Sequence, residues 1–180
     1  MYDCILAGET FPDEYRDCID LSKVGVAGFS YGATTAALSA ATHPDRYKAA
    51  VLLDGWFSMD LASIDNCAVK EVVDFPIQAF EKGIHCPALF LGSEEFDHYT
   101  HMRQATDRLQ ESCTKETKRV VVPGTVHWSF IDVALWTYGL APRFYNFLRR
   151  KLNVYSEVDP AENLEAVIQT SRDFLKEYLI

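Results

Sequence analysis

K-V-G-V-A-G-F-S-Y-G-A, residues 23–33, predicts a strand that turns sharply into a helix. Its valines and small residues form the short apolar run typical of a strand buried on both faces of a sheet. Gly28 and Gly32 flank Ser30, and because they lack Cβ atoms they allow strand and helix to approach closely while Ser30 adopts a strained conformation. G-x-S-x-G in this strand-turn-helix setting is the pattern of a nucleophile elbow.

The residue after the serine adds to this interpretation. The amide of Tyr31 would stand at a helix N-terminus, where free N–H groups favour negative charge. We therefore expect it to donate to an oxyanion. The alternative is a tight glycine turn in which Ser30 only caps the helix. Because the five-residue pattern is common by chance, the partners of Ser30 must decide between the two.

Length and composition describe a single soluble domain over residues 1–180, with 48% hydrophobic and 24% charged residues. The net charge of −9 argues against nucleic acid as a partner, since phosphate binding needs a basic face. No apolar run approaches membrane-spanning length, and the N-terminus lacks the basic and apolar parts of a signal peptide. A cytoplasmic location is the default expectation, and a secreted protein remains the alternative if an N-terminal signal precedes this sequence.

The five cysteines are odd in number, far apart and without a C-x-x-C pair. We expect reduced thiols, no structural zinc and no metal or other cofactor. None of the cysteines has elbow-like surroundings, which argues against a cysteine nucleophile, and Cys86 before a strand is predicted to be buried.

Strands and helices are predicted to alternate after the elbow. This spacing is typical of right-handed βαβ units and of a parallel sheet covered by helices on both faces. Between residues 57 and 84 we predict a loop and a short helix. The predicted strands are residues 47–53, 87–92 and 118–122, and the predicted helices are residues 31–42, about 99–112, an aromatic segment at 128–151 and a last helix from residue 160.

The last helix carries the clearest start signal. Asp159 is its predicted N-cap, Pro160 its first residue, and Glu162 follows three residues after the cap. One of its faces is an apolar stripe predicted to pack in the core, formed by Leu164, Val167, Ile168, Leu175 and Leu179.

A serine nucleophile needs a base, and the base needs an orienting carboxylate. His127 is the predicted base, because among the five histidines only it follows a strand near the C-terminal end. The acid stays open from spacing alone. Asp54 follows the strand after the elbow unit, whereas the cluster Glu94, Glu95 and Asp97 follows the next strand, the commoner position for the acid.

Four ordered motifs resemble the platelet-activating factor acetylhydrolase family, the plasma or type II group of phospholipases A2. They are V-A-G-F-S-Y-G-A, A-V-L-L-D-G-W, F-L-G-S-E-E-F and P-G-T-V-H-W-S-F, and the resemblance runs from about residue 20 to the C-terminus. It implies an α/β-hydrolase fold with Ser30, Asp54 and His127 as the catalytic triad. Phe29, Ala33 and Trp128 depart from the family pattern without removing a triad group.

The resemblance implies a calcium-independent serine esterase that removes the short sn-2 acyl chain of platelet-activating factor-like phospholipids. A complete α/β-hydrolase has several strands before the nucleophile, and a loop after an early strand supplies the second oxyanion donor. We therefore expect this chain to be the C-terminal part of the fold, with the N-terminal strands missing. Removing one oxyanion donor typically lowers the rate by about 10²–10³, so the activity of the chain alone is an open question.

Two other interpretations stay open. The triad is equally compatible with a generic carboxylesterase or peptidase, or with an inactive paralogue that acts as a binding module. An aromatic group could also contact a membrane or lipoprotein surface, although packing against the sheet is the simpler account. That group is Trp136, Tyr138, Leu140 and Phe144.

Overall fold

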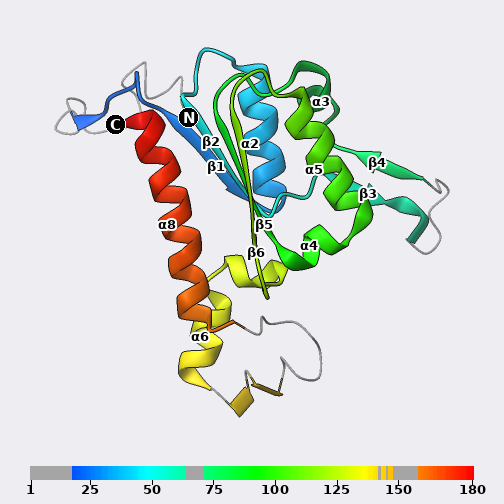
Figure 1. Ribbon diagram of the computed structural model, residues 1–180, viewed down its shortest axis with the longest axis vertical. Coiled ribbons are helices and arrows are strands. Elements are labelled where there is room, and N and C mark those ends of the chain that lie inside the picture. Colours follow the sequence, from blue (N-terminus) through cyan, green and yellow to red (C-terminus); the bar gives the residue numbers. More distant parts are fainter. Residues whose placement is uncertain (1–17, 64–70, 142, 145, 148–157) are drawn as a thin grey trace, which may run out of the picture.

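The computed structural model describes residues 18–63, 71–141, 143–144, 146–147 and 158–180. Its centre is a parallel four-stranded sheet in the order β1-β2-β5-β6, with helices on both faces (Figure 1). A separate two-stranded antiparallel sheet pairs β3 with β4. The predicted parallel sheet with helical cover is therefore confirmed.

Each element follows the chain order that Figure 1 labels. The strands are β1 (Gly25–Phe29), β2 (Ala49–Leu53), β3 (Ser58–Asp60), β4 (Val72–Asp74), β5 (Ala88–Ser93) and β6 (Thr117–Val122). The helices are α2 (Tyr31–Thr42), α3 (Ile77–Lys82), α4 (Glu94–His98), α5 (Thr100–Ser112), α6 (Val133–Leu140) and α8 (Pro160–Leu179), with 3₁₀ turns η2 (Leu61–Ser63) and η3 (His127–Phe130).

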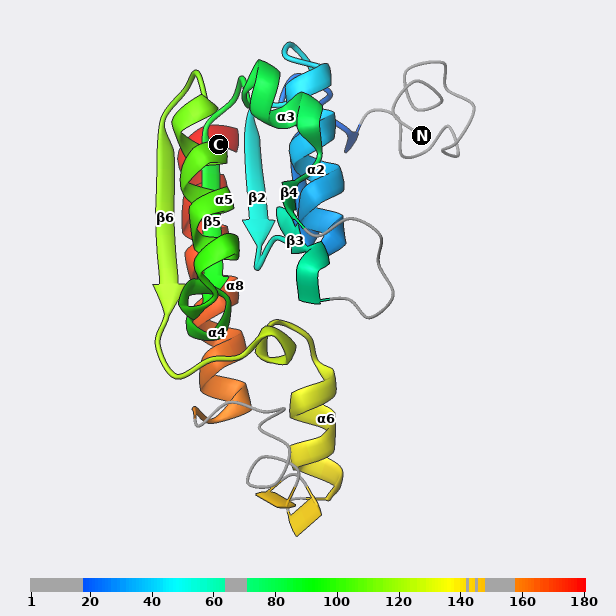
Figure 2. The same cartoon turned by 90° about the vertical axis from the view of Figure 1, so that its right-hand side faces the viewer.

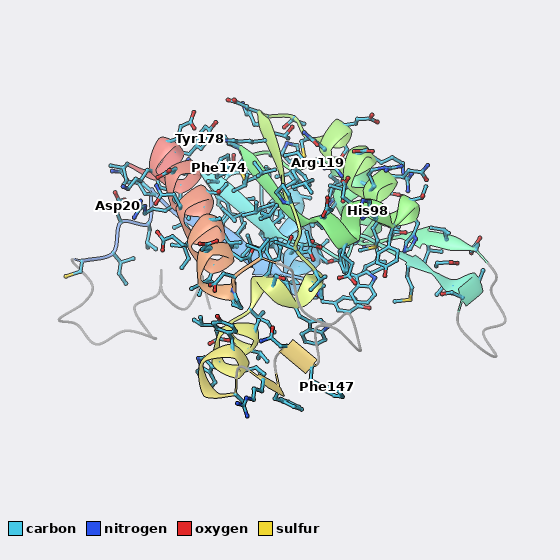
Figure 3. The ribbon with its side chains drawn as sticks, turned by 60° about the horizontal axis from the view of Figure 1, so that its bottom comes forward. Asp20, His98, Arg119, Phe147, Phe174 and Tyr178 are labelled. Carbon is cyan, nitrogen blue, oxygen red and sulfur yellow. The ribbon has the colours of Figure 1, made fainter. Side chains whose placement is uncertain are left out.

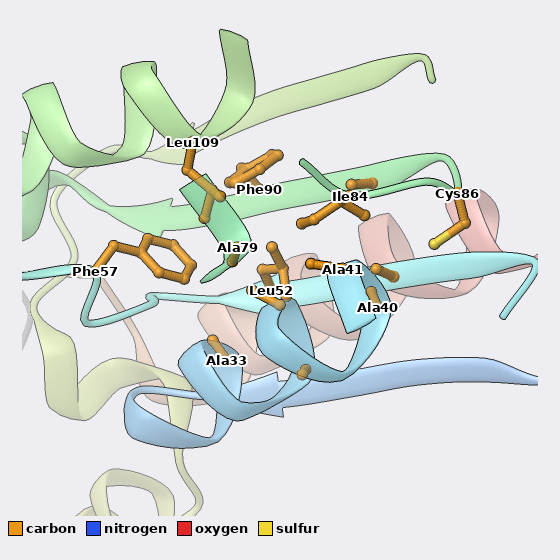
Figure 4. Packing of buried hydrophobic residues seen from close by; sticks show 14 of the residues in the cluster. Ala33, Ala40, Ala41, Leu52, Phe57, Ala79, Ile84, Cys86, Phe90 and Leu109 are labelled. Carbon is orange, nitrogen blue, oxygen red and sulfur yellow. The ribbon is translucent and has the colours of Figure 1, made fainter. Parts of the chain in front are cut away.

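Alternate residues of the central strands point to opposite faces and separate the core into two clusters. Ala50 and Leu52 of β2, with Phe90 of β5, face α2, α3 and α5 (Figure 4). Five alanines and Thr34 of α2 are buried, and their small side chains let this helix lie close against β1 and β2. The alanine-rich sequence after the elbow thus explains the tight packing that the strand-to-helix turn needs.

The other face of the sheet is covered mainly by α8. Val51 and Leu91 pack there against Val167 and Phe174 of that helix. Figure 2 shows α8 on the opposite side of the sheet from α2 and α3, and Figure 3 marks Phe174 and Tyr178 along it. The side chain of Asp159 accepts hydrogen bonds from the amides of Ala161 and Glu162 at the start of α8, so the predicted cap and start are confirmed.

Three predictions about local structure are corrected. β1 is an edge strand of the described sheet and is only half-buried, because β2 is its one partner within the described residues. The segment at 57–84 contains β3 and β4 besides the short helix α3, since three-residue strands leave too little periodicity to detect. Ile168 on α8 is 48% exposed, so the apolar stripe is wider than the face that packs.

Further differences concern the second half of the chain. The polar helix predicted at about 99–112 is confirmed as α5, and a short helix that the sequence did not predict, α4, precedes it. The aromatic segment at 128–151 forms η3 and α6, and its last residues lie outside the described part of the chain. Cys86 is buried, as predicted. Among the described residues, no helix is both long and apolar enough to span a bilayer.

Candidate active site

Ser30 lies at a sharp turn between β1 and α2. Its backbone has φ 57° and ψ −122°, a strained conformation for a residue with a side chain, as the elbow pattern predicts. A Cβ on Gly28 would lie 2.0 Å from the carbonyl oxygen of Gly32, so only glycine fits there. A Cβ on Gly32 would meet nothing within 4 Å, so the close approach depends on Gly28 alone and the prediction for Gly32 is wrong.

Asp54 directly follows β2 and is fully buried at its side chain. Its Oδ1 accepts a hydrogen bond from the amide of Ser93 at 2.6 Å, and its Oδ2 accepts one from the Ser93 hydroxyl at 2.8 Å. The carboxylate is thereby fixed by the end of β5, the strand that pairs with β2. Burying a charged group without such partners would be costly, so these bonds keep the carboxylate in place.

His127 begins η3, after the loop that follows β6. Its Nδ1 lies 2.7 Å from Oδ2 of Asp54, and its Nε2 lies 3.0 Å from Oγ of Ser30. The structure therefore brings together three residues that the sequence predicted as a set, although 97 positions separate Ser30 from His127. An acid, a base and a hydroxyl in this order have the geometry of a Ser-His-Asp triad.

The three other carboxylates considered as the acid have different partners. Glu94 accepts a hydrogen bond from the amide of Gly124 at 2.8 Å, and Glu95 accepts one from the amide of His127 at 2.7 Å. Both hold the segment Pro123–His127, which we call the base loop. Asp97 instead pairs with Arg119 on β6 at 2.6 Å. None of the three makes the contact with the imidazole that Asp54 makes.

An open pocket of about 400 Å³ begins at His127. Its lining is mostly aromatic and includes one carboxylate, that of Glu95. The residues that line it are Trp56, Glu95, Phe96, Tyr99, His101, Met102, His127 and Trp128.

Of the other histidines, His43 contacts the carbonyl of Ser39 and His85 contacts Thr114, away from the triad.

In the described ranges, histidine, cysteine and acidic side chains nowhere gather in a group of three or more with the spacing of a metal site.

Tyr31, the predicted oxyanion donor, is the first residue of α2, and its side chain stacks on Trp56 at 5.1 Å between ring centroids. Its amide thus belongs to the first turn, whose N–H groups have no acceptor within the helix.

Comparison with known proteins decides the family. A family model described as platelet-activating factor acetylhydrolase, isoform II, matches residues 5–180. The chain belongs to this family. Relatives named platelet-activating factor acetylhydrolase include those of Gallus gallus, 23% identical over 91% of this chain and 33% of the relative, and of Cavia porcellus, 23% identical over 92% and 32%. The chain spans about a third of the length of these acetylhydrolases.

The fold is shown by solved structures as well. The ferulic acid esterase from Streptomyces cinnamoneus superposes with a TM-score of 0.61 at 20% identity, over 89% of this chain and 42% of that one. At this identity the likeness concerns the fold, which is the α/β-hydrolase fold. Both the family and the fold predicted from the sequence are thus confirmed for this acetylhydrolase family member.

The residues that support the acid and the base are not apparent from the sequence. Ser93 lies in the motif F-L-G-S-E-E-F, but nothing in the sequence indicates that its hydroxyl reaches Asp54, 39 positions away. The same motif contains Glu94 and Glu95, whose carboxylates accept hydrogen bonds from amides of the base loop. A rule that residues ending adjacent parallel strands meet at one edge of the sheet would have placed these groups near each other, without giving their partners.

Proposed function

We propose that the chain carries the catalytic triad of a serine-dependent, calcium-independent esterase, with Ser30 as nucleophile, His127 as base and Asp54 as the orienting acid. The observation that supports this most strongly is the continuous hydrogen-bonded chain from Ser30 through His127 to the buried Asp54, with distances of 3.0 and 2.7 Å. Such a chain couples the removal of the serine proton to the orientation of the imidazole.

The reaction follows from this geometry in two steps. In the first, Nε2 of His127 accepts the proton of Ser30, whose Oγ forms a bond to the ester carbonyl carbon. The tetrahedral intermediate then collapses, the alcohol oxygen leaves with the proton from His127, and an acyl-serine remains. In the second, His127 takes a proton from water, the hydroxide attacks the acyl carbon, and Ser30 regains its proton as the acid departs.

Two neighbouring groups assist these steps. The amide of Tyr31, at the start of α2, is placed to donate to the oxyanion of the intermediate. Asp54 accepts the Nδ1–H of His127, fixes the tautomer that leaves Nε2 free as a base, and stabilises the imidazolium that forms. The partners of its carboxylate at Ser93 keep this acceptor from rotating away.

For the substrate we propose the short sn-2 acyl ester of platelet-activating factor-like phospholipids. Family membership and the names of the acetylhydrolase relatives support this. The pocket next to His127 lies where the leaving alcohol accepts its proton, and its aromatic walls suit a bulky, largely apolar leaving group. A phospholipid from which one acyl group is removed leaves such a group.

We also propose that the aromatic side chains of α6, together with Phe144 beyond its end, contact a lipid surface. Trp136 is 65% exposed, Tyr138 37% and Phe144 53%, so packing against the sheet does not account for them. Figure 3 labels Phe147, likewise more than half exposed, at the end of the molecule away from the sheet. The side chain of Leu140 lies outside the described residues. Exposed aromatic side chains of this kind suit the boundary between water and lipid.

A fluorophosphonate probe tests the triad directly, because it reacts covalently with an activated serine. We expect the 180-residue chain to be labelled and Ser30→Ala to remain unlabelled. Ser22→Ala, an exposed serine that pairs with Asp20, is the matched control and should label like the wild type. Failure of a folded wild-type chain to react would refute the esterase proposal and favour a binding module.

Substrate class is tested separately on the labelled chain. We expect release of acetate from 1-alkyl-2-acetylglycerophosphocholine to continue in the presence of a calcium chelator. Hydrolysis of p-nitrophenyl acetate without any hydrolysis of the phospholipid would instead identify a general carboxylesterase. Binding of Trp136→Ala to zwitterionic vesicles, compared with that of the wild type, tests the lipid surface, and equal binding would refute it.

A further inference from the structure

The imidazole of His127 lies between two phenylalanine rings. Phe29 stacks on it with ring centroids 4.7 Å apart and planes inclined by 25°, and Phe96 stacks on it at 4.3 Å and 6°. Phe29 ends β1, directly before the nucleophile, whereas Phe96 belongs to α4. Two elements distant in sequence thus supply flat apolar surfaces to one catalytic ring.

The two phenylalanines occupy opposite faces of the imidazole. Two rings stacked on one face at such short distances would also touch each other, and Phe29 and Phe96 form no ring contact with each other in the described chain. The buried ring of Phe130 lies nearly parallel to that of Phe29, with centroids 6.4 Å apart and planes inclined by 8°. The imidazole of His127 thus lies between Phe29 and Phe96, and Phe130 packs beside Phe29.

Rings that meet the edge of the imidazole complete its surroundings. Trp56 and Trp128 approach it edge-on, both with centroids about 6 Å away and steep interplanar angles. The hydrogen bonds to Asp54 and Ser30 use the two ring nitrogens and therefore lie in the plane of the ring. The faces of the imidazole are thus covered by aromatic carbon, and its edge is shared by the two catalytic partners and the tryptophan rings.

We propose that Phe29 and Phe96 are positioning residues, which fix the plane of the His127 ring and stabilise the positive charge it carries during the reaction. This inference rests on the proposed function, because it assigns a role within the same triad. It also gives a purpose to Phe29, at which this sequence departs from the pattern of the family it resembles.

The first part of the role is geometric. Rotation of the imidazole about its Cβ–Cγ bond would move Nε2 away from Ser30 and Nδ1 away from Asp54 at the same time. A ring stacked on each face opposes that rotation, because turning the imidazole drives its edges into both neighbours. Displacement of a catalytic group by about 1 Å lowers a rate by about 10²-fold, so a small gain in freedom has a large effect.

The second part is electrostatic. The face of an aromatic ring carries partial negative charge and attracts a cation above it. His127 becomes an imidazolium only after it accepts the proton of Ser30, so this attraction strengthens as the transition state forms. An interaction that strengthens in this way raises the rate of the chemical step rather than the affinity for substrate.

The test replaces each ring by an aliphatic side chain of similar bulk. In Phe96→Leu and Phe29→Leu we expect the maximal rate of fluorophosphonate labelling to fall by about 10- to 100-fold, with the half-saturating probe concentration nearly unchanged. Phe96→Tyr keeps the aromatic face and should label within a few-fold of the wild type. Phe174→Leu removes a buried ring of α8 from the same hydrophobic cluster that Phe29 packs against, but among the described residues this ring makes no contact with His127. It is therefore the matched control and should label at the wild-type rate.

A second readout does not need activity. Ring currents from two stacked phenylalanines shift the carbon-bound protons of the His127 ring upfield, and Phe96→Leu should move those signals downfield. Comparison with His127→Gln assigns the signals in the NMR spectrum. Phe174→Leu should leave them in place.

The outcomes separate the two proposals. If the wild type labels and Phe96→Leu labels equally fast, the positioning role is refuted while the triad stands. Equal loss of labelling in Phe96→Leu and Phe96→Tyr would also refute the positioning role, since an aromatic face would then not be the required feature. A folded wild-type chain that never labels would overturn the proposed function, and the positioning role with it, even if the NMR signals confirm the stack.

Discussion

Ser93→Ala is the substitution for which the structure predicts the largest effect from the smallest chemical change. The hydroxyl of Ser93 is fully buried and donates a hydrogen bond to Oδ2 of Asp54 at 2.8 Å. As the N-cap of α4, it also accepts a hydrogen bond from the amide of Phe96 at 3.2 Å. Removing one oxygen atom therefore breaks two hydrogen bonds, one of them to a buried carboxylate.

The expected magnitude follows from these two bonds. A hydrogen bond to a charged group stabilises a fold by about 1.5–3 kcal/mol. Loss of a serine N-cap costs about 0.5–2 kcal/mol. The free energy of unfolding should thus fall by about 2–5 kcal/mol, which is a large part of the stability of an ordinary domain. The bond from the Ser93 amide to Oδ1 survives the substitution, so Asp54 is weakened but not released.

Ser58→Ala is the matched control. Ser58 on β3 is also fully buried, and its hydroxyl has no hydrogen-bond partner in the part of the chain that the structure describes. The same loss of one oxygen atom should leave the free energy of unfolding unchanged or slightly increased, because no bond is broken.

Urea unfolding at equilibrium measures both variants, with the midpoint compared at equal slope. We expect a clearly lower midpoint for Ser93→Ala only. Equal midpoints for the two variants would refute the reasoning, since burial of a hydroxyl, rather than its bonds to Asp54 and Phe96, would then set the effect.

Other predictions address the elbow, the base loop and a buried thiol. Gly28→Ala should unfold the elbow region, because the new Cβ would lie 2.0 Å from a carbonyl oxygen. Gly32→Ala should raise the melting temperature, since alanine in a helix is about 1 kcal/mol more stable than glycine. A higher melting temperature for Gly28→Ala than for Gly32→Ala would contradict the elbow geometry. Glu95→Ala removes the hydrogen bond to the amide of His127, the proposed base, and should slow fluorophosphonate labelling about tenfold. An unchanged labelling rate would show that the base loop keeps its position without Glu95. Burial raises the pKa of the Cys86 thiol from 9.0 to about 11, so this thiol should resist iodoacetamide at pH 8 while exposed Cys18 reacts, as peptide mapping by mass spectrometry can show. Because the raised pKa belongs to the folded state, the stability due to Cys86 should be complete below about pH 9 and decline as the pH rises toward 11.

The sequence by itself determined the elements whose signals are local. The elbow at Ser30, the bounds of α2 and the capped start of α8 depend on glycine, alanine, proline and capping residues within a few positions of each other. The prediction that His127 is the base also needed only its place after the last strand. Such signals are legible because backbone sterics and helix capping act over one or two turns of chain.

Spacing along the chain left open which carboxylate pairs with His127; the family resemblance named Asp54, and the tertiary structure shows the contact. β2 and β5 are parallel neighbours, so Asp54 and the acidic residues after β5 all arrive at one edge of the sheet, and order along the chain does not separate them. The directions of the side chains do: Asp54 points to the imidazole, while Glu94 and Glu95 turn to the base loop. The phenylalanine rings that enclose His127 come from β1 and α4, and a juxtaposition of this kind exists only once the sheet has brought those elements together.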